Sequence, residues 1–124
     1  MYKGMFNNNT AHGVGTLKEP NGREYNGFWE NGLRKGIGIQ NYNETIYVGN
    51  WKNNKLTGFG IKVSQNGILY EGGYRNSRRH GIGTSLICDG IKYTQTWVDG
   101  NPVGNGFFFN SNSHTLVTTN GQQG

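Results

Sequence analysis

The sequence predicts an all-β protein, an elongated single-layer antiparallel sheet of stacked β-hairpins. Three observations support this fold class. A tyrosine opens a similar segment every 22 or 23 residues, an aromatic residue follows it four positions later, and a Gly-x-Gly sequence comes after an intervening turn. Self-similarity at a fixed period of this length is typical of repeat architectures, in which each unit is one supersecondary structure.

The composition indicates a thin folded protein rather than a globule with a deep core. Of 124 residues, 32% are hydrophobic, which is little material for several packed layers. Disordered chains contain few aromatic residues, whereas 13% of this chain is aromatic. The 22 glycines and 2 prolines favour many tight turns or close backbone contacts over a linker.

Each unit is expected to begin with a strand of the form Tyr-x-Gly-x-aromatic. Side chains alternate between the two faces of a strand, so these three positions share one face. The leading tyrosines are Tyr2, Tyr25, Tyr47, Tyr70 and Tyr93. The next positions hold Gly4, Gly27, Gly49, Gly72 and, as an exception, Gln95. The third positions hold Phe6, Trp29, Trp51, Tyr74 and Trp97.

A turn and a second strand complete each predicted hairpin. The turn residues are Asn8-Asn9, Asn31-Gly32, Asn53-Asn54, Asn76-Ser77 and Asp99-Gly100. We expect the loop to be longer than two residues, running for example from Asn31 to Lys35, with positive φ angles at asparagine or glycine. The second strand opens with Gly-x-Gly, and turns such as Pro20-Asn21-Gly22 lead to the next unit.

The glycines and the aromatic residues are expected to depend on each other. Bulky rings need space over the sheet, and glycines on the same face of neighbouring strands provide it. A single hairpin is marginally stable, so each unit must pack its aromatic face against the next one. Ten strands at about 4.8 Å spacing predict a twisted sheet roughly 45–50 Å long.

The combined pattern, Tyr-x-Gly-x-Trp-x-Asn-Gly-x-x-x-Gly-x-Gly, closely resembles the MORN (membrane occupation and recognition nexus) repeat family. His12-Gly13-Val14-Gly15 and His80-Gly81-Ile82-Gly83 are especially similar to the second strand of that repeat. The expected units are residues 2–24, 25–46, 47–69, 70–92 and 93–113. The resemblance implies a MORN-repeat solenoid without catalytic activity, used in related proteins for assembly at cytoskeletal, ciliary or membrane-associated structures.

The two ends of the predicted sheet depart from the repeat. The segment 114–124 is interpreted as a tail in which Thr115–Thr118 resembles a short capping strand followed by a flexible end. Tyr2 already belongs to the first unit, which leaves an edge of unpaired backbone groups. Three candidates to cover that edge are the tail, a second copy of the chain, which would form a homo-oligomer, and a different protein.

The sequence gives little indication of catalysis, and we expect no enzyme activity and no cofactor. The seven acidic residues are scattered, so no pair of carboxylates is placed to act across a bond. Cys88 with His12 or His80 is a weak candidate for a nucleophile and base, because both histidines occupy the same repeat position beside a turn. No metal-ligand spacing and no phosphate-binding loop is present.

Two groups of residues are candidates for binding a partner. The first is an aromatic groove that would bind a protein, although mutual packing is the main reason expected for these rings. Its members are Tyr25, Trp29, Tyr47, Trp51, Tyr70, Tyr74, Tyr93 and Trp97. The second is a basic rim formed by the hairpin loops of successive units, in a chain whose net charge is +5. Its members are Arg34, Lys35, Lys55, Arg78, Arg79 and His80.

The favoured function is that of a small scaffold or assembly subunit that binds a protein partner. The alternative is peripheral binding of the basic rim to anionic phospholipid headgroups, and nucleic-acid binding is less favoured. The chain has no long apolar run and no signal-type N-terminus, so we expect an intracellular, cytoplasmic protein. Val14, Ile37, Phe59 and Ile82 place apolar groups on the opposite face as well, so both faces are candidates for contact.

Overall fold

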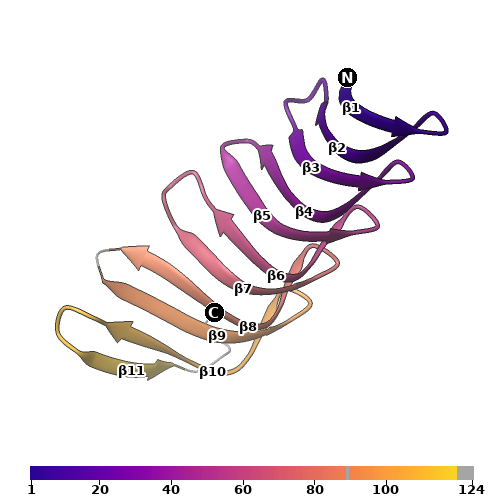
Figure 1. Ribbon diagram of the computed structural model, residues 1–124. Coiled ribbons are helices and arrows are strands. Elements are labelled where there is room, and N and C mark those ends of the chain that lie inside the picture. The colour runs from indigo at the N-terminus through magenta and orange to yellow at the C-terminus, as the bar shows by residue number, and fades with distance from the viewer. Residues whose placement is uncertain (89, 120–124) are drawn as a thin grey trace.

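Eleven β-strands follow one another across a single open sheet in the order in which they occur in the chain (Figure 1). The computed structural model describes residues 1–88 and 90–119. All neighbouring strands pair antiparallel. The strands are β1 (Tyr2–Asn7), β2 (Thr10–Lys18), β3 (Glu24–Glu30), β4 (Leu33–Tyr42), β5 (Thr45–Lys52), β6 (Lys55–Val63), β7 (Leu69–Arg75), β8 (Arg78–Cys88), β9 (Ile91–Val98), β10 (Asn101–Asn110) and β11 (Thr115–Thr119).

The predicted fold class is confirmed. The described residues contain no helix, and each of the five units contributes one hairpin to the sheet. Within this part of the chain there is accordingly no helix long and apolar enough to cross a membrane. The strands bend into arcs, so the sheet is curved like a gutter (Figure 1).

The turn inside each hairpin is shorter than expected. β3 ends at Glu30 and β4 begins at Leu33, so Asn31 and Gly32 alone connect them. Their φ angles of 51° and 80° are both positive, as in the type I′ turn whose twist matches that of paired strands. The loop predicted from Asn31 to Lys35 is therefore wrong in length.

The residues left over from the shorter turn form a β-bulge in the second strand. Gly27 pairs with Gly38, but Trp29 pairs with Arg34, so β4 has extra residues between these two pairs. Gly36 lies in this bulge with a φ of 74°, a conformation that strongly favours glycine. The first glycine of Gly-x-Gly thus bends the strand, and the second one pairs across the sheet.

The two faces of the sheet differ in burial. The face that carries the repeat tyrosines and tryptophans, here called the inner face, holds the core of the protein. Its core residues are Tyr25, Trp29, Trp51, Leu56, Tyr70, Tyr74 and Trp97, each at most 7% exposed. The opposite, outer face carries side chains that are more than half exposed, such as Phe59 and Ile82. A single-layer sheet buries one face in this way when it curves around that face.

The C-terminal segment adds a strand at the far end of the sheet. β11 pairs with β10 through five residue pairs, from Gly106 with Thr119 to Asn110 with Thr115. β11 lies at the end opposite β1 (Figure 1), so this strand does not cover the edge of β1. Of the three candidates for that edge, the described part of the tail is thereby ruled out.

Candidate protein-binding surfaces

The aromatic rings of the inner face pack edge to face along the sheet. Tyr25 contacts Trp29 of its own unit at 5.1 Å and Trp51 of the next unit at 5.5 Å between ring centroids. Tyr2 repeats this arrangement with Phe6 at 5.1 Å and Trp29 at 5.4 Å. Perpendicular pairs of this kind are a favourable geometry for aromatic rings. Tyr2 and Tyr25 therefore each join two successive units.

Hydrogen bonds fix the polar ends of these rings. The Tyr25 hydroxyl donates to the Phe28 carbonyl at 3.1 Å, and Trp51 Nε1 donates to the Gly38 carbonyl at 3.1 Å. Burial raises the pKa of Tyr25 to about 12. A Cβ atom added to Gly38 would lie 2.1 Å from the Tyr25 hydroxyl, so only glycine leaves room for this ring. Among the described residues, Tyr74 Oη and Trp97 Nε1 are buried without a hydrogen-bond partner.

The predicted groove residues do lie together on the inner face, but most of them are covered. Tyr25, Trp29, Trp51, Tyr70, Tyr74 and Trp97 are buried. Tyr47 and Tyr93 are half-buried and offer ring surface to a partner. The rings thus form the floor of the inner face rather than an exposed row, and partner binding by the eight residues stays a prediction.

Two arginines lie over this floor. The Arg34 guanidinium stands 4.8 Å from the Trp51 ring centroid and that of Arg79 stands 3.7 Å from the Trp97 centroid. Arg34 also donates to the Asn54 carbonyl at 2.8 Å and to Gln40 Oε1. Burial lowers the pKa of Arg34. These cation–π contacts shield the tryptophans, so both arginines have a structural role that the sequence reasoning missed.

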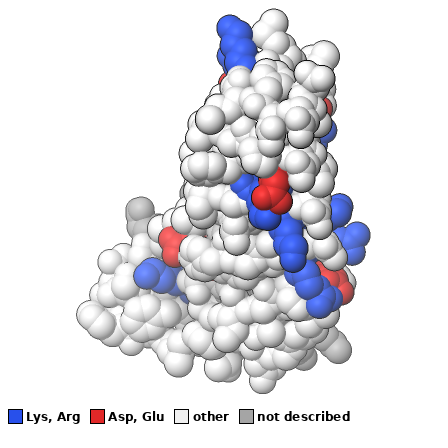
Figure 2. Space-filling model, turned by 45° about the vertical axis from the view of Figure 1, so that its right-hand side comes forward, with Lys and Arg blue, Asp and Glu red and all other residues white. Residues whose placement is uncertain are grey.

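The other residues of the predicted basic rim are placed differently from one another. Lys35 pairs with Glu30 at 2.8 Å, and His80 Nδ1 accepts a hydrogen bond from the Asp99 backbone at 3.2 Å. Lys55 and Arg78 form no ion pair with any residue in the described part of the chain. Figure 2 shows a diagonal row of Lys and Arg side chains with acidic side chains beside it. Anion binding by the six rim residues stays a prediction.

Two cavities open on the inner face on either side of Tyr47. One, of about 290 Å³, is lined by Arg23, Arg34, Gln40, Tyr42, Tyr47, Trp51, Asn54, Leu56 and Ser77. The other, of about 200 Å³, is lined by Tyr47, Lys62, Tyr74, Ser77, Arg78, Arg79 and Gly100. Both combine ring edges with cationic groups. Among the described residues, none that line either cavity is acidic. Arg23 is paired with Glu19 at 2.6 Å, and Asp99, next to Gly100, pairs with Arg75 and His80.

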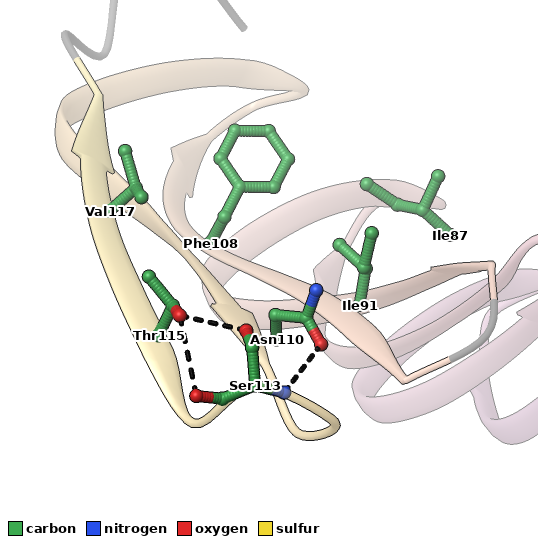
Figure 3. Close-up of a pocket in the computed structure, with 7 residues that line it drawn as sticks. All are labelled: Ile87, Ile91, Phe108, Asn110, Ser113, Thr115 and Val117. Carbon is green, nitrogen blue, oxygen red and sulfur yellow. Dashed lines mark hydrogen bonds between the residues drawn. The ribbon is translucent and has the colours of Figure 1, made fainter.

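A third cavity, of about 480 Å³, lies at the C-terminal end of the sheet (Figure 3). Its apolar wall comes from β8 to β11 and consists of Ile87, Ile91, Phe108 and Val117. Asn110, Ser113 and Thr115 close one side, with Ser113 N donating to Asn110 Oδ1 at 3.3 Å. Phe108 lies 4.6 Å from Tyr93 between ring centroids, so this cavity continues the aromatic floor beyond the last tryptophan.

The two histidines considered as catalytic bases accept hydrogen bonds from the turn backbone of the next unit. His12 Nδ1 accepts a hydrogen bond from the Asn31 backbone N–H at 3.4 Å. His80 Nδ1 accepts the equivalent bond from the Asp99 backbone N–H in a later unit. The side chain of Cys88 and residue Asp89 lie outside what the structure describes. In the rest of the chain, no three His, Cys, Asp or Glu side chains are grouped as metal ligands would be.

The outer face carries a row of exposed apolar side chains that the sequence had indicated in part. Val14, Phe28, Ile37, Phe59 and Ile82 are 50–69% exposed and lie on β2, β3, β4, β6 and β8. We call these five residues the outer row. Phe28 was not predicted, because it lies in the first strand of its unit, between the glycine and the tryptophan of the repeat pattern.

Comparisons with known proteins agree with the repeat seen in the sheet. The chain matches the MORN repeat over residues 2–22, 25–43, 47–68, 70–92 and 96–114. It is also 39% identical over 66 residues to alsin of Mus musculus and, equally, to alsin of Homo sapiens. The match covers 48% of this chain and 4% of alsin, so the chain spans only a small part of the length of these relatives.

Proposed function

The chain belongs to the MORN repeat family, and from this premise we propose that it is a non-catalytic scaffold that binds a partner protein along its inner face. The proposal extends to a role as a subunit of a larger assembly, of the cytoskeletal, ciliary or membrane-associated kind that the family resemblance implies. The match to alsin adds that similar repeats occur within a much longer protein.

One observation supports the inner face most directly, namely that Tyr47 lies between the two central cavities with cationic groups around it. Tyr47 lines both cavities, and Lys62 Nζ lies 5.7 Å from its ring centroid. Tyrosine and arginine are enriched at protein interfaces because they combine a large contact area with hydrogen-bonding ends. The surrounding buried rings hold this area rigid, which lowers the entropic cost of binding.

The shape of the inner face favours a helix or an extended segment as the bound element. The cavities around Tyr47 and the cavity at Phe108 all lie along the curved inner face. A partner segment that lies along this face can therefore place successive side chains in them. The cationic lining favours carboxylate side chains beside Tyr47, and the apolar C-terminal cavity favours an aliphatic or aromatic side chain.

Charge reversal on the two faces tests this proposal. Lys62→Glu alters the inner face, and Lys92→Glu is a matched control on the exposed outer face. We expect proteins captured from a native extract by the wild type to be retained by K92E and lost by K62E, with circular dichroism unchanged in both. Capture of the same proteins by both variants, at equal yield, would contradict an inner-face binding site.

Binding to an anionic membrane is the second candidate function. It is favoured by the net charge of +5 and by Lys55 and Arg78, which form no ion pair with the described residues. Exposed cations near a surface contribute about 1 kcal/mol each to attraction by anionic lipid. Sedimentation with phosphatidylserine vesicles, for the wild type and for a Lys55→Ala, Arg78→Ala variant, tests it. Equal sedimentation of the two proteins would exclude Lys55 and Arg78 from the lipid site.

A further inference from the structure

The cavity of about 200 Å³ between Tyr47 and Tyr74 lies where the repeat departs from its own pattern. Tyr74 occupies the position that tryptophan holds in the units before and after it. Trp51 donates from Nε1 to the Gly38 carbonyl, whereas the hydroxyl of Tyr74 is buried and has no hydrogen-bond partner among the described residues. Leaving a buried hydroxyl without a partner costs free energy, so such a group in a native fold calls for an explanation.

Arg79, which lines the same cavity, lacks the hydrogen-bond acceptors that an equivalent arginine has. Arg79 pairs across the sheet with Tyr74 in the same way that Arg34 pairs with Trp29. The Arg34 guanidinium donates to the side-chain and backbone oxygens of Asn54. The Arg79 guanidinium likewise lies over a tryptophan ring, but it has no acceptor in the part of the chain that the structure describes.

Two residue differences account for the missing acceptors. The backbone N–H of Asn54 donates to the Arg34 carbonyl, and the backbone N–H of Gly100 donates to the Arg79 carbonyl in the same way. Gly100 therefore stands in the place of Asn54, but it has no side-chain oxygen. Ser85 likewise replaces, in the strand ladder, the glutamine that accepts from Arg34. The later unit thus keeps the cation at the wall of the cavity without its partners.

The other polar side chains of this cavity also offer donors. Lys62 and Arg78 form no ion pair and no side-chain hydrogen bond with any described residue, and neither does the half-buried Tyr47 hydroxyl form such a bond. The Ser77 hydroxyl accepts from the Leu56 backbone N–H at 3.0 Å, which leaves its own hydrogen free to donate. Since none of the described lining residues is acidic, the cavity is suited to an anionic group.

Three cations and several hydroxyls suit a phosphate monoester better than a carboxylate. A phosphate monoester carries a charge of about −1.5 to −2 at pH 7 and three acceptor oxygens. The planar fork of Arg79 can bind two of these oxygens, while Lys62 and Arg78 supply further positive charge. Burial raises the pKa of Tyr74, so its hydroxyl keeps its proton at neutral pH and remains a donor.

The neighbouring cavity favours a protein as the source of the phosphate. Tyr47 lines both cavities, and the other cavity adds the Tyr42 and Trp51 rings and the amide groups of Gln40 and Asn54. A segment with a phosphorylated side chain in the first cavity brings its next residues over the second one, where rings and amides are available to contact them. The acyl chains of a lipid headgroup bound in the first cavity would make no comparable use of the second.

We propose that the cavity between Tyr47 and Tyr74 binds the phosphate of a phosphorylated serine or threonine in the partner segment, with Arg79 as its principal ligand. The inference rests on the proposed binding of a protein at the inner face, and it adds that phosphorylation of the partner controls this binding. Lys62 and Arg78 attract the phosphate, and the Tyr74 hydroxyl gains the acceptor that the described chain does not supply.

An NMR titration of the ¹⁵N-labelled protein with short peptides tests the site in the absence of any partner. The probes are acetyl-Ala-phosphoserine-Ala-amide and the matching peptides with aspartate and with unmodified serine. We expect the phosphoserine peptide to shift the backbone amide signals of Ser77 and Gly100 and the indole signal of Trp97, with a dissociation constant in the millimolar range. The aspartate peptide should bind at least tenfold more weakly. Equal binding of these two peptides, or no shift with the phosphoserine peptide, overturns the proposal.

Two variants assign the binding to the cavity. Arg79→Gln should weaken binding of the phosphoserine peptide at least tenfold, and Lys92→Gln, which removes the same charge from the outer face, should bind as the wild type does. Because Arg79 also packs on Trp97, Tyr74→Phe provides a second readout. It removes only a hydroxyl that has no partner in the described chain, so it should weaken peptide binding at least threefold without lowering stability. Peptide binding that is unchanged in both cavity variants overturns the proposal.

Two further measurements distinguish the source of the phosphate. Phosphatase treatment of a native extract should abolish capture by the wild type, and capture that persists would overturn this inference while leaving the proposed inner-face function in place. Vesicles of phosphatidylcholine and phosphatidic acid, a lipid with a phosphate monoester, should sediment Arg79→Gln and Lys92→Gln equally. A specific loss of vesicle binding in Arg79→Gln, with a phosphoserine peptide that does not bind, would overturn the proposal in favour of a lipid headgroup.

Discussion

Gly38 and Tyr25 show how a glycine in this repeat provides the space that a tyrosine ring occupies. The hydroxyl of Tyr25 lies where a Cβ atom of Gly38 would be, and the same relation holds between Tyr2 and Gly15 and between Tyr70 and Gly83. The third unit departs from it, because a Cβ atom added to Gly60 would lie 2.8 Å from the Tyr74 ring and 3.2 Å from Leu56, and not against the Tyr47 hydroxyl. The second glycine of Gly-x-Gly is thus required by a ring in most units, not by its own backbone.

Replacing Gly38 with alanine is expected to destabilise the protein by about 3 kcal/mol, because the added methyl group forces the buried Tyr25 ring out of its place. Gly22→Ala is the control, since Gly22 has a positive φ of 94° but open space around it. Its cost should be about 1 kcal/mol, from backbone strain alone. Equilibrium unfolding in urea measures both, and equal losses would show that the Tyr25 contact does not set the requirement.

The buried tyrosines predict a loss of stability at alkaline pH. Burial raises the pKa of Tyr25 from 10.0 to about 12, and it also raises the pKa of Tyr70 and of Tyr74. Between these pH values the folded protein keeps protons that the unfolded chain has released, so stability falls as the pH rises. Tyr25 alone accounts for a loss of roughly 2–3 kcal/mol when its shift is complete.

Urea unfolding from about pH 9 to about pH 12 should show this decline, and tyrosine absorbance should titrate later in the folded protein than in the unfolded one. Tyr25→Phe removes the ionisable group, so its stability should decline less steeply over the same range. A wild-type stability that does not change across this range would contradict the burial of these hydroxyls.

At the scale of elements, the hairpin turns tie each unit to the one before it. The turn amides of Gly32, Ser77 and Gly100 donate to Ala11, Leu56 and Arg79 of the preceding units at 2.8–2.9 Å. In the third unit Asn54 Oδ1 accepts a hydrogen bond from the Arg34 backbone N–H at 2.8 Å. The Arg34 guanidinium also donates to the Asn54 carbonyl. Packing of rings on the inner face and bonding of turns at its edge therefore hold the units together.

Asn54→Ala is expected to cost about 1–2 kcal/mol more than Asn9→Ala, because it leaves the backbone N–H and the Nε of Arg34 without the Asn54 Oδ1 acceptor. The two asparagines have nearly the same φ, 67° and 64°, so the strain of placing alanine there is matched. Among the described residues, the Asn9 side chain forms no hydrogen bond to another unit. Urea unfolding of both variants measures the difference, and an equal loss would mean that the turn contributes nothing between units.

The sequence predicted the hairpins and the positions of the turns, since asparagine and glycine recur where positive φ is needed. It did not predict that Asn31-Gly32 alone forms the turn, because a bulge at Gly36 and a longer loop produce the same residue spacing. The structural roles of Arg34 and Arg79 were also missed. Their positions beside the turn suggested a basic rim, and only the curvature of the strands brings their guanidinium groups over Trp51 and Trp97.

For the whole molecule, the family and the single-layer fold followed from periodicity, whereas the distribution of exposed surface did not. Period-two alternation says that Tyr25 and Ile37 lie on opposite faces, but both faces of a flat sheet are equally exposed. Curvature decides that one face is buried, and it arises from a bulge in every unit. The burial of Gln95 in the last unit was likewise not predicted from the sequence. Gln95 occupies the glycine position and is 2% exposed, and its side-chain amide donates to the Val103 carbonyl at 2.8 Å.

The register of glycine against glycine, Gly27 with Gly38 and Gly38 with Gly49, has a consequence for length. The hairpins share one register, so inserting or deleting a complete hairpin moves everything beyond it by roughly 9.6 Å and rotates it by the twist of two strands, without exchanging its inner and outer faces. Duplication of the gene segment for one hairpin would then lengthen the sheet and keep the same side chains on the same face. The length of the sheet is therefore set by the number of hairpins, in increments of two strands.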